Sequence, residues 1–198
     1  MRCRIDMKYA DYFADVPTLC TSRLIIRAFT REDMEAYLAI IQNPEVTKYT
    51  GNAFDGFFKD ERDIQNWLNN INGRLLKAKK VFTWCVEHKE NQRVIGRIDL
   101  GGFDMRSMAD VAYHISSDYW NKGLTTEAIG AVTDFGLKKL LLHRIQAFVM
   151  PQNKASIRVL EKNEYEQEGL LRKYRFGKEF HDAVMLSIIR EENIGVEK

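Results

Sequence analysis

Residues 119–128, Tyr-Trp-Asn-Lys-Gly-Leu-Thr-Thr-Glu-Ala, combine residue types that suit an anion-binding turn. A short run rich in β-forming residues, 111–115, precedes them, and a helical pattern follows. The first backbone N–H groups of a helix lack intrahelical partners and lie at the positive end of its dipole, so they attract anions. Gly123 would let the backbone approach such an anion closely, and Lys122 would add a cation beside it.

The same segment also fits an ordinary helix start that needs no ligand. Thr125 or Thr126 would be the N-cap, and Glu127 would lie favourably in the first turn. Local chemistry alone does not separate the two interpretations. A second motif further along the chain favours the anion site.

This second motif begins with an apolar-rich strand over residues 145–150 and continues through residues 151–162, Pro-Gln-Asn-Lys-Ala-Ser-Ile-Arg-Val-Leu-Glu-Lys. Asn153 is a favoured N-cap for the helix expected after it. Two strands joined by a helix form a right-handed parallel crossover. The turn then lies at the carboxyl end of the first strand, where ligand crevices occur in such sheets.

Together, Trp-x-x-Gly-x-Thr-x-Glu-Ala in the turn and Pro-x-Asn-x-x-Ser-x-x-x-Leu-Glu-Lys in the second motif resemble the GNAT superfamily of acetyl-CoA-dependent N-acetyltransferases. The resemblance covers about residues 21–190 and is greatest to the branch that acetylates ribosomal-protein N-termini. It implies one α/β (α+β) domain over residues 1–198, with residues 1–20 as an N-terminal extension. The implied GNAT acyl-CoA N-acyltransferase fold is a mixed, mostly antiparallel, splayed central sheet of about seven strands flanked by helices.

The resemblance also implies acetyl-CoA as cosubstrate and direct transfer to a primary amine in a ternary complex. In GNAT proteins the pantetheine arm inserts into a V-shaped gap between two strands, and Ile115 matches the position whose backbone bonds it. Asn153 matches an amide that contacts pantetheine, and Ser156 would approach the sulfur. The implied cofactor-binding residues are Ile115, Trp120, Asn121, Lys122, Gly123, Leu124, Thr125, Thr126, Asn153 and Ser156.

A protonated amine has no lone pair with which to attack a thioester, so the reaction needs a base. His114 has a suitable intrinsic pKa and shares one strand face with Asp110, although a water chain is an alternative. Many GNAT proteins have a Tyr at the position of Leu160 to protonate the departing thiolate, and Leu cannot do so. Ser156 or solvent would then supply the proton. The catalytic candidates are His114, Ser156 and Asp110, with Asp99 and Asp182 as further candidate bases.

The other elements follow from alternation and helical spacing. Residues 1–19 show no clean period and predict a loosely packed extension, and Gly101-Gly102 is expected to end a strand. Helices are predicted between Thr30 and Asn43 and over residues 61–71, 125–142 and 154–163. Strands are predicted over residues 23–28, 81–86, 93–100, 109–116, 144–150, 168–176 and 181–189.

The composition of the 198 residues, 45% hydrophobic and 29% charged, fits one globular domain. A net charge of +2 gives no reason to expect nucleic-acid or membrane partners. Cys3, Cys20 and Cys85 are widely separated, which predicts neither a disulfide framework nor a metal site. Without a long apolar run or a signal-peptide core, a cytoplasmic location is expected. Because the last strands often form dimers in the resembled fold, a homodimer is an open alternative.

The sequence does not identify the acceptor. The resemblance favours the α-amine of a protein or peptide, of the ribosomal-protein type, but the same branch acetylates small amines such as antibiotics and polyamines. A non-catalytic coenzyme-A-binding regulatory module is the alternative from a different class. A nucleotide-binding protein of Rossmann or Walker type is disfavoured because neither glycine motif occurs.

Overall fold

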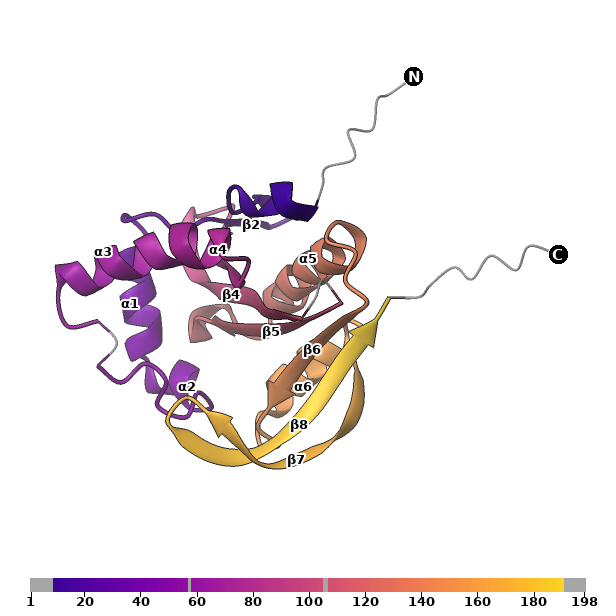
Figure 1. The fold of residues 1–198 in the computed structure, drawn as a ribbon. Coiled ribbons are helices and arrows are strands. Elements are labelled where there is room, and N and C mark those ends of the chain that lie inside the picture. The colour runs from indigo at the N-terminus through magenta and orange to yellow at the C-terminus, as the bar shows by residue number, and fades with distance from the viewer. Residues whose placement is uncertain (1–8, 57, 105–106, 191–198) are drawn as a thin grey trace, which may run out of the picture.

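A single mixed sheet with helices on both sides organises the chain (Figure 1). The computed structural model describes residues 9–190 except 57, 105 and 106, so Cys3 and the first part of the expected extension lie outside the described residues. The strands are β1 (Leu19–Cys20), β2 (Leu24–Arg27), β3 (Val81–His88), β4 (Arg93–Asp104), β5 (Met108–Ile115), β6 (Arg144–Val149), β7 (Glu166–Phe176) and β8 (Glu179–Ile189). The helices are α1 (Met34–Gln42), α2 (Pro44–Thr47), α3 (Glu61–Asn69), α4 (Leu75–Lys77), α5 (Leu124–Lys138) and α6 (Lys154–Glu161), and single turns occur at Tyr9–Phe13, Asn70–Arg74 and Ser117–Tyr119.

The strand order within the described residues is β1-β2-β3-β4-β5-β6-β8-β7. All neighbouring pairs are antiparallel except β5 and β6, which run parallel on either side of the crossover helix α5. The predicted GNAT fold, with its mixed and mostly antiparallel sheet, is therefore confirmed. The sheet has eight strands rather than about seven. The short β1, within the region expected to be an extension, was not predicted.

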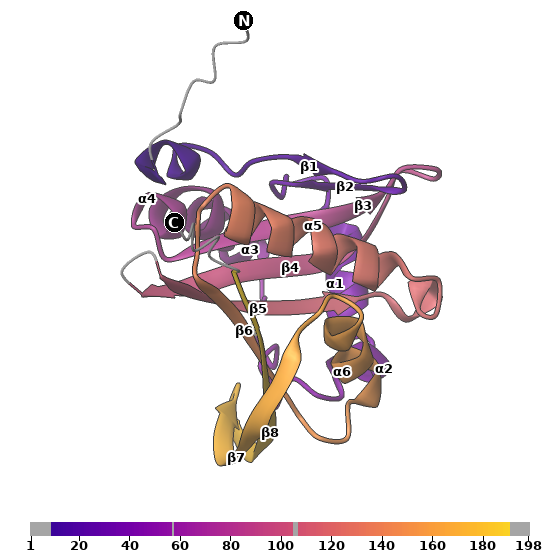
Figure 2. The ribbon, with the colours of Figure 1, turned by 90° about the vertical axis from the view of Figure 1, so that its right-hand side faces the viewer.

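The sheet splits between its two parallel strands. Only three residue pairs join β5 to β6, at Met108–Arg144, Ala109–Ile145 and Asp110–Gln146. Beyond Asp110 the two strands diverge, and Figure 2 shows β6, β8 and β7 turning steeply away from β4 and β5. The split therefore opens toward the carboxyl ends of both strands, as a splayed sheet predicts.

Two apolar cores hold the helices against opposite faces of the sheet. The larger core lies under α5, where Gly136 lets the helix approach so closely that a side chain there would contact Ile145 and Leu100. The smaller core lies under α1 and α3 and contains the stacked rings of Tyr37 and Trp67. The split therefore opens between two different helical layers.

No helix in the described part of the chain has the length and apolar character needed to cross a membrane.

The N-terminal segment packs more firmly than predicted. Phe13 is only 3% exposed and stacks on Phe82 of the larger core, with ring centroids 4.4 Å apart. The Pro17 carbonyl accepts a hydrogen bond of 2.7 Å from the Trp84 indole N–H. The expectation of a loosely packed extension is therefore wrong for this part of the chain, because a single buried aromatic residue has no periodicity to reveal it.

Strand β4 also differs from its prediction. Instead of ending at Gly101-Gly102, it continues to Asp104 through an irregularity in its pairing with β5. Gly102 has φ +64°, a backbone conformation that glycine adopts without steric cost. The two glycines therefore mark a β-bulge rather than a strand end.

Candidate active site

The segment between β5 and α5 forms an open turn at the N-terminus of the helix. Gly123 is the N-cap residue with φ +74°, and Asn121 also has a positive φ of 59°. The backbone N–H groups of residues 121–126 have no acceptor in the described chain. Neither Thr125 nor Thr126 caps α5, which has no side-chain cap bond. The turn therefore presents N–H donors at the positive end of the helix dipole, an arrangement that binds phosphate groups.

Side chains of the turn hold its shape. The Trp120 indole N–H donates to the Ile115 carbonyl at 2.8 Å, and Leu124 is buried in the larger core. The Lys122 ammonium donates to the Asp118 carbonyl at 2.8 Å, so it folds back onto the chain. The anion-binding capacity of the turn in this conformation comes chiefly from its backbone.

An ion pair from a distant part of the sequence braces the turn. Arg23 donates from Nε to Glu127 at 2.7 Å and from Nη1 to the Lys122 carbonyl at 2.9 Å. Burial would raise the pKa of Glu127, but hydrogen bonds from Thr21, Arg23 and Ser22 lower it to about 2. The Glu127 carboxylate is therefore charged near neutral pH. The guanidinium of Arg23 balances this charge, which would otherwise repel an incoming phosphate.

Sequence reasoning missed the role of Arg23, which was assigned only to a strand. Glu127 was the available signal, because a carboxylate in the first turn of a helix that binds an anion needs a cation nearby. Nothing in the sequence indicates which of the 30 basic residues supplies that cation. Arg23 and Glu127 are 104 positions apart.

The split exposes backbone groups of β5. Ser116 donates its N–H to the Ile95 carbonyl at 2.7 Å, which fixes the hydrogen-bonding phase of the β4–β5 ladder. Bonded and non-bonded pairs alternate in such a ladder, so Ile115 and Tyr113 occupy non-bonded pairs with β4. Their N–H and C=O groups therefore point toward the side where β6 has diverged. The Ile115 N–H is therefore free for the backbone contact predicted with a pantetheine arm, whereas its carbonyl accepts the Trp120 indole N–H.

A pair of hydroxyl groups lies between β5 and α6. Tyr113 Oη is 2.9 Å from Ser156 Oγ, and burial raises the pKa of Tyr113 to about 12 although this hydrogen bond opposes the change. Asn153 caps α6 by accepting the Ser156 N–H at 3.2 Å. Leu160 is fully buried. Tyr113 was assigned only to a strand face, so sequence reasoning missed that it brings a hydroxyl to Ser156.

His114 faces the smaller core under α1 and α3, on the side of the sheet opposite to α5. Its ring stacks on Tyr37 at 5.6 Å between centroids and meets the Phe54 ring edge-on at 5.2 Å. The Nε2 atom is buried and has no hydrogen-bond partner among the described residues. Burial, aided by the charge of Arg97, lowers the pKa of His114 to about 3. The imidazole is therefore neutral near pH 7, with an unpaired nitrogen.

Asp110 lies at the closed end of the split. It accepts a 2.9 Å hydrogen bond from the Gln146 amide, and burial raises its pKa although that bond opposes the change. Four residues separate it from His114, a distance of roughly 13 Å along a strand. The structure therefore does not bring Asp110 together with His114 and Ser156.

The two further candidate bases are engaged elsewhere. Asp99 forms a 2.8 Å ion pair with Arg97 and accepts a 2.7 Å hydrogen bond from the Thr83 hydroxyl. Asp182 accepts the Lys173 N–H at 3.1 Å on the exposed β7–β8 hairpin. Neither carboxylate contacts His114.

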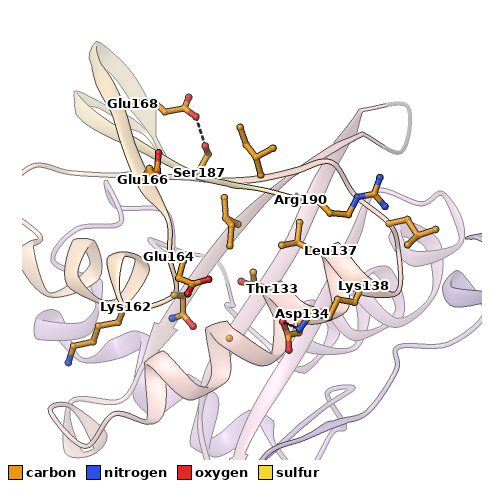
Figure 3. Close-up of a pocket in the computed structure, with 15 residues that line it drawn as sticks. Thr133, Asp134, Leu137, Lys138, Lys162, Glu164, Glu166, Glu168, Ser187 and Arg190 are labelled. Carbon is orange, nitrogen blue, oxygen red and sulfur yellow. Dashed lines mark hydrogen bonds and ion pairs between the residues drawn. The ribbon is translucent and has the colours of Figure 1, made fainter. Parts of the chain in front are cut away.

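A cavity of about 970 Å³ lies away from the split and contains none of the predicted site residues (Figure 3). Thr133 and Leu137 of α5 line one side, and Ser187 and Ile188 of β8 line another. Charges of both signs surround it, including Lys138. The turn at Gly123 and the open split have the chemistry expected of an acyl-carrier site, and this cavity does not.

A splayed sheet with an open, N–H-rich turn at its open end is the arrangement that the resemblance to acyl-CoA-dependent N-acyltransferases predicted. Residues 23–166 match the Acetyltransferase (GNAT) domain family, and the chain belongs to this family. It is 32% identical over 163 residues to the uncharacterized N-acetyltransferase YoaA of Bacillus subtilis (strain 168), an alignment that covers 81% of this chain and 89% of that protein. The protein is an N-acetyltransferase that uses acetyl-CoA as cosubstrate.

Solved structures show the same fold. A GNAT-family acetyltransferase from Bacillus anthracis is 29% identical with a TM-score of 0.74, covering 89% of this chain and 100% of that one. Mycobacterium smegmatis RimJ in complex with CoA-disulfide is 20% identical with a TM-score of 0.76, covering 88% of each chain. Spermidine N-acetyltransferase from Vibrio cholerae, in complex with CoA and spermine, is 19% identical with a TM-score of 0.70, covering 86% of this chain and 97% of that one.

Proposed function

We propose that this N-acetyltransferase acts on an amine presented at the end of a chain, namely the α-amine of a protein or peptide N-terminus of the ribosomal-protein type. The observation that carries this proposal is a bridge between the β7–β8 hairpin tip and the loop that follows α2. Lys178 donates its N–H to the Gly51 carbonyl at 2.9 Å and its ammonium to the Asp55 carbonyl at 3.0 Å. Asn52 donates to Glu179 at 2.5 Å.

We infer that this bridge closes a ring of chain around the acceptor approach, because it joins the hairpin tip to the loop that carries Phe54, whose ring meets the His114 ring edge-on. The hairpin reaches from the far edge of the sheet to the loop near α2, which Figure 1 shows at the lower left. If the acceptor were an internal lysine, the acceptor polypeptide would continue on both sides of that residue, and both segments would have to fit around the ring. A chain terminus enters such a ring end-on, which favours an α-amine over an internal lysine.

The proposed chemistry assigns roles around the split. The amine nitrogen attacks the thioester carbonyl carbon, a C–N bond forms, the C–S bond breaks and its electrons leave on sulfur. His114 Nε2, unpaired among the described residues, is the candidate acceptor of the amine proton by position, but burial lowers its pKa to about 3 and makes the imidazole a weak base, so a water chain is the competing route for this proton. The backbone N–H of Ile115 is assigned to polarise the carbonyl. The Tyr113 and Ser156 hydroxyls are assigned to stabilise the departing sulfur.

A small-molecule amine is the second candidate acceptor, because a small amine also enters a ring end-on. Both types occur among the structural neighbours, as the names of ribosomal-protein-S5-alanine acetyltransferase from Vibrio fischeri and of spermidine N-acetyltransferase indicate. In the remaining alternative, the protein binds coenzyme A as a regulatory module and transfers no acetyl group.

Thiol release from acetyl-CoA separates these alternatives. The acceptors are lysine-free peptides with free α-amines, including ribosomal-protein N-terminal sequences, the same peptides blocked at the α-amine but containing an internal lysine, and a set of small amines. We expect turnover with the free α-amines and none with the blocked peptides. Equal turnover of internal lysine would contradict the proposal, and turnover of small amines alone would establish the second candidate. Acetyl-CoA binding without turnover on any acceptor would favour the regulatory module.

A further inference from the structure

The face of β5 between Asp110 and His114 is open at Ala112, although the strand lies inside the sheet. Ala112 is exposed, whereas Val111 and Ile115 on the other face are buried. Asp110 and His114 lie on the same side as Ala112, one at each end of this open stretch. A strand with neighbours on both edges normally has at least one covered face and often two, so an uncovered alanine there leaves room for a ligand.

Asp110 has no cation to balance it in the described residues. Its hydrogen-bond partner is the neutral amide of Gln146, which in turn accepts a 3.0 Å bond from Arg144 Nε. The guanidinium of Arg144 is committed to Glu168 through two bonds of 2.6 and 2.7 Å. The network therefore holds the Asp110 carboxylate in place without neutralising it.

Other carboxylates on this side of the sheet are paired directly with arginines. Arg27 contacts Asp33 and Glu87, both at 2.7 Å, and Arg97 contacts Asp99 at 2.8 Å. Asp110 is also half-buried, and burial raises its pKa. A partly desolvated carboxylate with only a neutral partner is electrostatically costly, and an incoming cation would relieve that cost.

The surroundings of Asp110 suit an organic cation. Tyr174 and Phe148 stack with ring centroids 4.5 Å apart, and Phe148 shares the β6 face of Gln146. Burial, with a smaller contribution from the charge of Asp110, raises the pKa of Tyr174. Aromatic rings beside a carboxylate are the usual setting for alkylammonium and guanidinium groups. Gly102 leaves the carboxylate accessible, since a Cβ there would lie 3.0 Å from Asp110 Oδ2.

We propose that Asp110 binds a second cationic group of the acceptor, an alkylammonium or guanidinium held roughly 10–13 Å from the amine that is acetylated, the length of three to four residues of β5. This inference rests on the proposed function, because the acetylated amine must lie near His114. The shared chemistry has two sources. One is a lysine or arginine side chain close to a peptide N-terminus, and the other is the second amine of a diamine.

Calorimetry on coenzyme-A-saturated protein tests this charge dependence without requiring turnover. One arm compares linear diamines of increasing length with monoamines of the same length, and the other compares N-terminal peptides that carry lysine or norleucine close to the α-amine. In the native protein we expect the additional cation to tighten binding by about tenfold in at least one arm. The arm that shows the effect identifies the source of the cation.

The variants are Asp110→Asn and the matched control Asp134→Asn, which makes the same charge change in an exposed i, i+4 pair on α5. The advantage of the cation should disappear in Asp110→Asn and persist in Asp134→Asn. No advantage in the native protein in either arm, or an advantage that survives in Asp110→Asn, would overturn the inference. Unfolding temperatures check that both variants remain folded.

Acetyl transfer measured with the same acceptors keeps the two proposals separate. Charge-dependent binding without transfer would leave the role of Asp110 standing and remove the proposed function. Transfer to α-amines without any charge dependence of binding would support the proposed function and remove the role of Asp110.

Discussion

The turn at Gly123, which is the predicted cosubstrate site, and the open face of β5 are built in opposite ways. The turn comes from consecutive residues, its donors are backbone N–H groups, and one glycine with φ +74° sets its shape. The open face is assembled from side chains of several elements, including His114 of β5, Phe148 of β6 and Tyr174 of β7. A backbone site tolerates many sequences, whereas a site made of converging side chains changes with each of them. The first suits a cosubstrate common to a family, and the second suits an acceptor that differs between its members.

The largest expected effect comes from destroying the backbone site. Gly123→Val places a β-branched residue at φ +74°, which strains the turn, and its Cβ would lie 3.5 Å from Nη2 of Arg23. We expect acetyl-CoA affinity to fall by about 100-fold, close to 2.7 kcal/mol, with the fold retained. Calorimetry measures the change. Gly169→Val in β7 is the control, since Gly169 has no close neighbour at its Cβ position and no positive φ. Unchanged affinity in Gly123→Val would remove the turn from the binding site.

The second prediction concerns the burial of His114 on the open face. Its pKa of about 3 lies below the ordinary value of 6.5, so the unfolded chain binds more protons between these two pH values. The contribution of His114 to stability is therefore fully present above pH 6.5 and is lost as pH falls toward 3. We expect the free energy of unfolding to decrease by about 2 kcal/mol from this residue between pH 6.5 and 4.5.

Denaturant unfolding across this pH range compares the native protein with His114→Phe, which keeps an aromatic ring between Tyr37 and Phe54. The variant should show a flatter dependence on pH. Identical slopes would mean that His114 titrates normally and that this face is wetter than its contacts indicate.

The third prediction tests the ion pair that braces the turn. Arg23→Gln leaves Glu127 charged beside the N–H groups that are predicted to bind phosphate, so we expect the KM for acetyl-CoA to rise about tenfold. The double variant Arg23→Gln/Glu127→Gln removes the repulsion and should recover part of the loss. Steady-state kinetics of the single and double variants form a double-mutant cycle. Strictly additive effects would show that Arg23 does not act through Glu127.

The smallest expected effect concerns the hydroxyl pair. Tyr113→Phe removes the group that contacts Ser156, and we expect kcat to fall about threefold to tenfold, as for one lost hydrogen bond to a developing charge. Tyr165→Phe is the matched control, because Tyr165 makes an equally long 2.9 Å bond to Thr133 within the structural core. Both variants should lose similar stability, but only Tyr113→Phe should lose kcat. Equal kinetic effects would assign Tyr113 a structural role.

The features that sequence reasoning predicted are those encoded locally. Periodicity located the longer helices and strands, usually within a few residues, but not the short β1, α2 and α4. The turn was readable because its chemistry is contiguous. Contacts between distant segments were not readable. The Arg23–Glu127 pair and the bridge from Lys178 to Gly51 depend on how the sheet brings separate segments together. The burial of Phe13 was missed for the same reason, because the sequence around an isolated aromatic residue does not show which core that residue packs into.

The three-pair junction between β5 and β6 has a consequence for the order of events. Past Asp110, the edge of β5 that faces β6 has no paired strand. An extended pantetheine arm, with its amide groups, would hydrogen-bond to this edge in place of a strand. The bound cosubstrate would then complete the sheet beside β5, and the acceptor would bind against this completed surface. Acetyl-CoA should accordingly bind first and coenzyme A leave last, with slowed amide exchange along β5 during the interval between them.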